Sequence, residues 1–166
     1  MELLIFSDAH GRTDGMTWAL NAQVRRPHGI CFLGDGLGAL DALGDAIPVY
    51  AVRGNCDWDA ASATYPTELL LSMEGHTLLL THGHLYGVKG GMGALIAHAA
   101  EVHADVVLFG HTHAAHEETI PAGTQIGNRM LESPMYLFNP GSIGYDHSFG
   151  ALLLRGDTVL FSHGSV

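Results

Sequence analysis

The sequence predicts an α/β (α+β) fold in which two mixed β-sheets pack together and helices cover them. Three observations favour this class. Six short apolar runs stop abruptly near Gly, Pro, Asn or Asp, as buried strands do where they leave a core. Segments with helical spacing alternate with the first of these runs. Two hairpin patterns follow later in the chain.

The strands are expected wherever an apolar run meets polar residues. These runs, with the polar ends that follow them, cover residues 3–11, 30–36, 49–57, 77–84, 106–113 and 135–142. Residues 67–82 predict a hairpin that turns at Glu74-Gly75-His76, and residues 151–162 predict another that turns at Gly156-Asp157. No linker, internal repeat or low-complexity segment interrupts this pattern.

Helices are expected between the early strands. Residues 13–26 predict one, because apolar residues recur there at helical spacing behind Thr13 or Asp14 as the N-cap. A shorter helix is expected over residues 38–46. Another is expected over residues 91–104, where glycines weaken its start.

The composition limits the size of the protein and its partners. A chain of 166 residues, 47% of them hydrophobic, is expected to form one domain over residues 1–166. Seven Lys and Arg face 17 Asp and Glu, a formal net charge of −10, so extended nucleic-acid binding is not expected. No apolar run approaches the roughly 18–20 residues of a membrane span. The N-terminus lacks a signal-peptide pattern, and the expected location is the cytoplasm.

Metal-ligating residue types gather where the predicted strands end. The seven candidates are Asp8, His10, Asp35, Asn55, His82, His111 and His113. In an extended backbone the members of an i, i+2 pair point to the same side, so Asp8 and His10 could face one place. The same holds for His111 and His113. Loops converge beyond the carboxyl ends of strands, where ligands bind. The joint placement of these residues therefore predicts a metal site.

Seven donors suit two cations better than one. Asp35 is the candidate bridge, because a carboxylate can offer one oxygen to each of two ions. One site would use Asp8, His10, Asp35 and His113, and the other Asp35, Asn55, His82 and His111. Taken singly, each residue has a simpler explanation in a turn or helix cap, and only their combination outweighs it. Mixed Asp, Asn and His donors suit Mn, Fe, Zn, Co or Ni.

Six ordered blocks resemble the signature of the calcineurin-like binuclear metallophosphoesterases. They are SDAHG (7–11), GDG (34–36), RGNCD (53–57), THGH (81–84), GHTH (110–113) and NPGS (139–142). The chain is most similar to the small bacterial, YfcE-like phosphodiesterase branch. The resemblance implies a four-layer αββα sandwich and the two ligand sets given above. It also implies two divalent metal ions, often Mn²⁺, with Fe, Zn, Ni, Co or Mg as alternatives, and a possible homo-oligomer.

One position departs from the pattern of many family members. They carry a histidine after the ligating asparagine, where this chain has Cys56. A thiol is a poor proton donor near neutral pH, so water or His84 would protonate the leaving group, unless the leaving group is acidic enough to need no proton. His84 could instead support a metal ligand. Arg53, Asp57 and Asn139 are expected to position loops rather than to take part in the chemistry.

The donor set and the resemblance together predict a metal-dependent phosphodiesterase. A hydroxide that bridges the two ions would attack a small phosphodiester, with Asp35, Asn55 and His84 as the catalytic candidates. One alternative is a non-catalytic interaction scaffold of the same fold, such as a retromer subunit. The other is a phosphomonoesterase or nuclease of the same superfamily.

Overall fold

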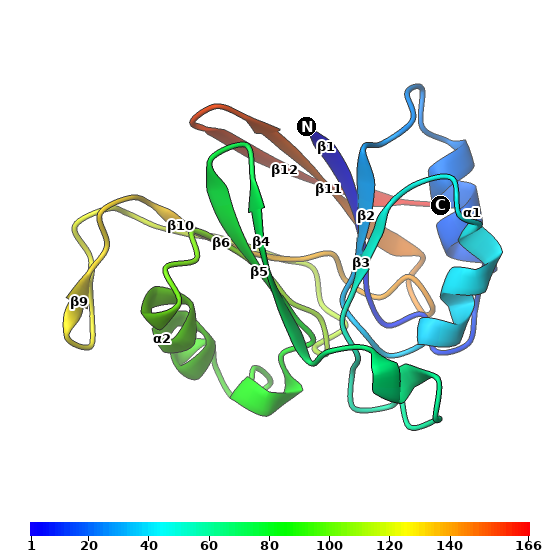
Figure 1. The fold of residues 1–166 in the computed structure, drawn as a ribbon, viewed down its shortest axis with the longest axis horizontal. Coiled ribbons are helices and arrows are strands. Elements are labelled where there is room, and N and C mark those ends of the chain that lie inside the picture. Colours follow the sequence, from blue (N-terminus) through cyan, green and yellow to red (C-terminus); the bar gives the residue numbers. More distant parts are fainter.

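Two five-stranded mixed sheets form the centre of the fold. The computed structural model describes residues 1–166 (Figure 1). The first sheet has the spatial order β12 (Thr158–Ser165), β11 (Ser148–Arg155), β1 (Glu2–Phe6), β2 (Gly29–Phe32) and β3 (Val49–Ala51). The second has the order β4 (Glu68–Met73), β5 (His76–Thr81), β6 (Val106–Leu108), β10 (Met135–Asn139) and β7 (His116–Ile120). A small ribbon pairs β8 (Gln125–Ile126) with β9 (Arg129–Met130).

Strand direction determines where the loops meet. In the first sheet β1, β2 and β3 run parallel, and in the second sheet β5, β6 and β10 do so. The remaining strands of both sheets pair antiparallel with their neighbours. Within each sheet, the parallel strands therefore deliver the loops at their carboxyl ends to one edge.

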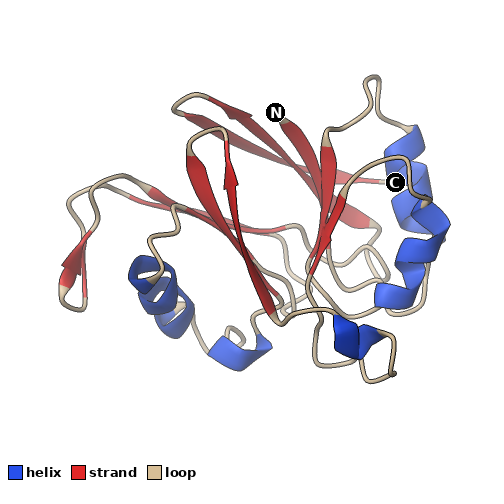
Figure 2. Ribbon diagram, in the orientation of Figure 1, coloured by secondary structure: helices blue, strands red, loops and turns tan.

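Helices cover both outer faces of the sheet pair. The helix α1 (Asp14–Asn21) and the 3₁₀ segment η1 (Leu37–Leu43) cover the first sheet, and α2 (Gly93–Glu101) covers the second (Figure 2). Two short 3₁₀ turns, η2 (Ser62–Thr64) and η3 (His84–Tyr86), lie in loops. None of these helices combines the length and the apolar character that crossing a membrane requires.

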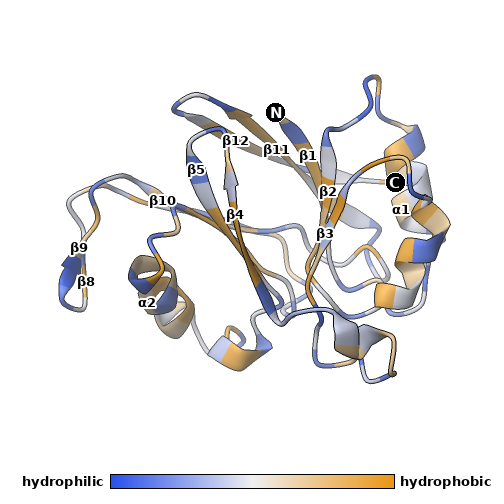
Figure 3. Ribbon diagram, in the orientation of Figure 1, coloured by the Kyte–Doolittle hydropathy of each residue, from blue (hydrophilic) through white to orange (hydrophobic).

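Three apolar clusters separate the four layers. The cluster between the sheets includes Leu3, Ile5, Leu78 and Leu80. The cluster under α1 includes Leu4, Phe6, Met16 and Ala19. The cluster under α2 includes Leu79, Leu95, Ala99 and Val107. Successive residues of β1 thus alternate between two cores, as a strand that is buried on both faces requires, and hydrophobic colouring follows the strands in Figure 3. The predicted αββα sandwich is confirmed.

Both predicted hairpins are present. β4 and β5 pair so that Met73 faces His76, which leaves Glu74 and Gly75 as a two-residue turn with φ of 51° and 86°. Positive φ at both positions is the geometry that matches the twist of a hairpin. β11 and β12 turn at Gly156-Asp157, as expected, although β11 begins earlier than residue 151.

The other differences concern short or exposed segments. The helix expected over 38–46 is the 3₁₀ segment η1, which is bounded by Gly36 (φ 124°) and Gly44 (φ 65°). The helix expected over 13–26 ends at Asn21. Strands β7, β8 and β9 were not anticipated, because most of their side chains are exposed and polar, and no apolar alternation marks them.

His76 ties the two sheets together at the end where β5 and β6 begin. Its Nδ1 donates to Asp105 Oδ2 at 2.5 Å, and its Nε2 donates to the Gly156 carbonyl at 2.8 Å. Partial burial alone would lower the pKa of His76, but Asp105, the Gly156 carbonyl and the charge of Asp157 raise it. Two acceptors on two ring nitrogens favour the imidazolium.

Candidate metal centre

All seven predicted donors lie in loops that follow parallel strands. Asp8 and His10 follow β1, Asp35 follows β2, and Asn55 follows β3. His82 comes directly after β5, and His111 and His113 follow β6. These loops belong to both sheets. The centre is therefore assembled across the sandwich rather than on one sheet.

The backbone of these loops is left-handed, not extended. Positive φ values between 47° and 67° occur at Asp8, His10, Asp35, His111 and His113. The expectation that each i, i+2 pair is extended was therefore wrong. Left-handed conformations are uncommon for residues other than glycine and cost about 1–3 kcal/mol each at such sites. Contacts with surrounding residues must therefore stabilise all five of these residues in the left-handed conformation.

The first donor group contains Asp8, His10 and His113. Asp8 Oδ2 accepts hydrogen bonds from Ser7 Oγ at 2.6 Å and from the His111 backbone N–H at 3.1 Å. Its other oxygen, Oδ1, is buried and has no hydrogen-bond partner. Oδ1 lies 3.2 Å from His113 Nε2 and 3.8 Å from His10 Nε2. The free oxygen thus faces both imidazoles.

The second donor group contains Asp35, His82 and His111. His82 Nδ1 donates to the Leu33 carbonyl at 2.6 Å, which leaves Nε2 to act as a ligand. His82 Nε2 is buried and lies 3.3 Å from Asp35 Oδ2, but without hydrogen-bond geometry. It also lies 3.9 Å from Asp8 Oδ1, so the two donor groups are adjacent.

Asn55 and His84 lie beside these groups. The backbone N–H of Cys56 donates to Asp35 Oδ1 at 2.7 Å, which places Asn55 one residue from a contact of Asp35. Asn55 is exposed, and its amide nitrogen donates to Cys56 Sγ at 3.3 Å. The His84 ring centre is 5.4 Å from that of His82, and its buried Nδ1 has no partner. Cys56 Sγ itself lies near donor atoms of His10 and Asp35.

The protonation of these groups follows from their surroundings. Burial would raise the pKa of Asp35, but the His82 imidazole and the Cys56 N–H hold it well below its usual range. Burial and the charge of His82 lower the pKa of His111 to about 4, so its imidazole is neutral near pH 7. Burial would lower the pKa of His82, but the nearby carboxylates outweigh burial and raise that pKa. The raised pKa favours a protonated imidazole, and a metal ion that binds Nε2 would have to displace the proton.

The donor set fits divalent cations. Asp8 Oδ1 and His82 Nε2 are buried polar atoms without partners, which is costly unless an ion satisfies them. Carboxylate oxygen with imidazole nitrogen is a donor mixture that first-row transition metals accept. The residues present therefore match what the resemblance implies.

Asp57 and Asn139 hold the donor loops. Asp57 accepts backbone N–H bonds from the Asp35 loop and from Gly54, all at 2.8–3.0 Å. Buried Asn139 donates to the Gly110 carbonyl at 2.9 Å and to Thr112 Oγ1 at 3.1 Å, which fixes the GHTH loop. These contacts agree with the positioning roles that we expected for both side chains.

Close backbone approach requires glycine at two points. A Cβ on Gly54 would lie 2.1 Å from Asp35 Oδ1, and a Cβ on Gly110 would lie 1.9 Å from Ser7 Oγ. Any larger residue would push the donor loops apart. The blocks RGNCD and GHTH thus combine a donor with the glycine that lets another donor loop approach.

Tyr145 is a neighbour of the centre that the sequence did not reveal. Its ring stacks on His113 with centres 5.2 Å apart, and its centre is 5.0 Å from that of His10. The side chain is exposed, and its backbone N–H donates to Ser142 Oγ at 3.1 Å. No periodicity marks such a residue, because it belongs to an irregular loop.

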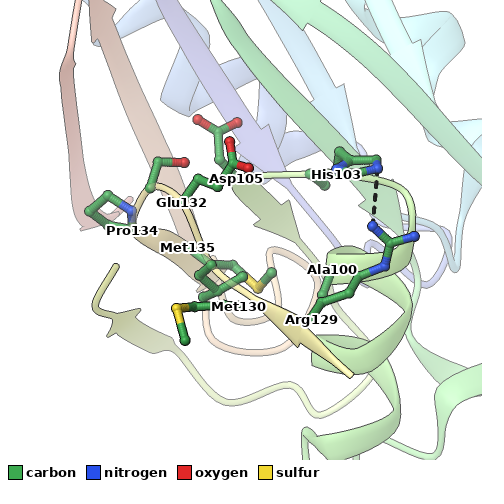
Figure 4. Close-up of a pocket in the computed structure, with 11 residues that line it drawn as sticks. Ala100, His103, Asp105, Arg129, Met130, Glu132, Pro134 and Met135 are labelled. Atoms are coloured by element: carbon green, nitrogen blue, oxygen red, sulfur yellow. Dashed lines mark hydrogen bonds between the residues drawn. The ribbon is translucent and has the colours of Figure 1, made fainter. Parts of the chain in front are cut away.

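A separate hollow lies near the starts of β6 and β10, away from the donor loops. It has a volume of about 390 Å³ and is lined by His103, Asp105, Arg129 and Glu132, among others (Figure 4). Arg129 points to His103 there, with 3.3 Å between Nη1 and Nε2. None of the seven predicted donors lines it.

Comparison with known proteins places this geometry in a family. The sequence matches the calcineurin-like phosphoesterase superfamily domain over residues 1–155. It is 33% identical over 165 residues to the probable metallophosphoesterase YsnB of Bacillus subtilis strain 168, covering 96% of this chain and 88% of that protein. It is 35% identical over 115 residues to phosphodiesterase YfcE of Escherichia coli K12, covering 63% of this chain and 52% of YfcE.

Solved structures support the fold. A predicted phosphoesterase from Streptococcus pneumoniae TIGR4 superposes with a TM-score of 0.74 at 19% identity, over 99% of this chain and 88% of that one. Zinc-bound Vps29 from Entamoeba histolytica gives 0.74 at 21% identity, over 98% and 91%. At these identities the likeness concerns the fold alone. The match over residues 1–155 and the likeness to YsnB show that this chain belongs to the calcineurin-like phosphoesterase superfamily.

Proposed function

We propose that this protein hydrolyses small phosphodiesters at two divalent metal ions. The observation that carries the proposal is the pair of buried, unpartnered donor atoms, Asp8 Oδ1 and His82 Nε2. They lie 3.9 Å apart, and each faces further donors of its own group. Two adjacent groups of this kind are an arrangement suited to two ions rather than to one.

The ligands divide between the ions with Asp35 in common. One ion would be held by Asp8, His10, Asp35 and His113, and the other by Asp35, Asn55, His82 and His111. When bound, divalent ions polarise the phosphoryl group and provide a hydroxide nucleophile near neutral pH. Mn²⁺ is the ion we expect, and Fe, Zn, Ni, Co and Mg are the alternatives to test.

The protein side chains near the centre favour diesters with acidic leaving groups. Burial and the charge of His82 lower the pKa of His84, so its imidazole is mostly neutral near pH 7 and is a weak proton source. Desolvation and the nearby Asp35 carboxylate raise the pKa of the Cys56 thiol to about 11, so it carries no charge. Neither His84 nor Cys56 therefore supplies a positive charge for the additional negative charge that a monoester carries.

The test is turnover of bis(4-nitrophenyl) phosphate by purified protein with Mn²⁺ or with EDTA. Asp35→Asn should lower kcat/KM by at least about a hundredfold, since losing a shared ligand exceeds the 10–100-fold effect of an outer partner. Glu132→Gln, in the separate hollow, is the matched control and should retain activity. Full activity in Asp35→Asn, or in EDTA, would contradict the proposal.

The same assay separates the alternatives. 4-Nitrophenyl phosphate should be the poorer substrate, and faster turnover of it would identify a phosphomonoesterase. An interaction scaffold would hydrolyse neither ester under any of the metals. Structural likeness to Vps29 concerns the fold and does not decide between these outcomes.

A further inference from the structure

A cavity of about 380 Å³ opens beside the second donor group. Asn55 and His84 belong to its wall, together with Arg53, Trp58 and Leu85. A phosphodiester has two ester arms, and a phosphate bound at the metal centre would direct one of them toward neighbouring space. This cavity adjoins the proposed catalytic residues, so its chemistry bears on which arm the protein accepts.

Arg53 is the unusual residue in this wall. The other six Lys and Arg side chains of the protein are exposed, whereas Arg53 is half-buried. Its backbone N–H donates to the Pro66 carbonyl at 2.9 Å, which fixes the residue in place. No hydrogen bond or ion pair involves its guanidinium. A partly desolvated charge without a partner is costly, and Arg is suited to binding a carboxylate or phosphate through two parallel hydrogen bonds.

The carboxylates of the cavity do not pair with Arg53. Asp57 directs both oxygens to backbone N–H groups of the donor loops. Asp59 accepts from the backbone N–H and the hydroxyl of Ser62, at 2.9 Å and 2.6 Å. Both acids thus have hydrogen-bond partners other than Arg53. The Arg53 guanidinium is the cation left in the wall.

The other side chains in the wall indicate which chemical groups a ligand would carry beside its anionic group. Trp58 is 84% exposed and Leu85 is 63% exposed, so two large apolar side chains stand at the rim. Arg53 and His84 both line this cavity, so the guanidinium and the imidazole belong to the same wall. Arg129 in the hollow of Figure 4 differs, since it is exposed and contacts His103.

We propose that this cavity binds an anionic group, a carboxylate or phosphate, at the end of one ester arm, with Arg53 as its partner. The substrates are then small phosphodiesters that carry a second negative charge, joined by a spacer that crosses Trp58 and Leu85. This inference rests on the proposed function for the position of the phosphate. It explains how a protein of net charge −10 would select an anionic substrate.

The competing explanation is that Arg53 only offsets the charge of Asp57 and Asp59. In that case the charge at the end of the ester arm would make no difference to the affinity of the ligand. A ligand pair that differs only in the charge of the arm separates the two explanations. 4-Phosphonobutyrate and its neutral terminal amide form such a pair, since both present a phosphonate to the metal centre.

Calorimetric titration of the Mn²⁺-loaded protein measures the ratio of the two dissociation constants. The wild type should bind the carboxylate at least about tenfold more tightly than the amide, as expected for one charge-assisted pair. Arg53→Gln should bring the ratio close to one, and Arg53→Lys should restore part of it. Butane-1,4-bisphosphonate tests whether a phosphate-type anion is bound more tightly than a carboxylate.

Arg129→Gln is the matched control and should keep the wild-type ratio. A wild-type ratio within about twofold of one, or a ratio unchanged in Arg53→Gln, overturns the inference. Melting curves and bound Mn²⁺ are measured for each variant, so that a misfolded protein is not taken for a result. The titration measures binding and does not require that the protein hydrolyse any ester. A protein that is inactive but keeps the wild-type ratio of dissociation constants would therefore contradict the proposed function and leave this cavity as an anion site.

Discussion

The Asp57 carboxylate joins two donor loops, and its replacement by alanine should destabilise the protein strongly. It accepts backbone N–H bonds from Asp35, Gly36 and Leu37 in one loop, and from Gly54 in its own. At about 1 kcal/mol for each of these partly buried bonds, the loss in unfolding free energy is about 4 kcal/mol. For a chain of this size that corresponds to a fall in Tm of about 8–16 °C. Asp57→Asn, which keeps one acceptor, should lose about half as much.

The assay is urea and thermal unfolding of the metal-free protein, followed by circular dichroism. Asp41→Ala is the matched control, because Asp41 is exposed and its removal changes the net charge equally. Charge alone predicts the opposite sign, since a protein of net charge −10 gains stability when a negative charge is removed. A loss below about 1 kcal/mol in Asp57→Ala would refute the claim that this carboxylate holds the loops.

Three further outcomes are expected. The raised pKa of His76 means that its stabilisation is complete below about pH 6.5 and is lost as the pH rises through the folded-state pKa. The Tm values at about pH 6 and about pH 9 should therefore differ more for the wild type than for His76→Gln, and equal differences would count against stabilisation by the bonds of His76 to Asp105 and Gly156. Cys56→Ser should change kcat/KM by less than about threefold, because a thiol of pKa about 11 is no nucleophile, whereas a hundredfold loss would make it a participant. Gly54→Ala should weaken Mn²⁺ binding at least about tenfold by equilibrium dialysis, because the new Cβ would meet Asp35, and unchanged affinity would contradict that reasoning.

Much of the fold could be predicted because its strands are apolar on both faces. Residues such as Leu3, Leu4 and Ile5 form an uninterrupted apolar run, and the structure places them in alternate cores. The segments that were missed lack this signal. β7 runs along an edge and exposes Glu117 and Glu118, so neither its burial nor its periodicity distinguishes it from a loop.

The donor positions could be predicted, but their backbone geometry could not. Residue types and their place after strands indicated where Asp8, Asp35 and His111 would gather. Their left-handed φ values depend on contacts distant in sequence, such as the bond from His111 N–H to Asp8. The role proposed for Arg53 could not be predicted either, because only the folded structure shows that its guanidinium has no partner.

The number and position of bound ions test the proposed two-metal centre most directly. Anomalous diffraction at the manganese edge, from crystals grown with Mn²⁺, reports both. We expect two peaks that share Asp35, one also contacted by the Asp8 group and the other by the His82 group. A single peak, no peak, or ions bound away from these side chains would contradict the proposed two-metal centre.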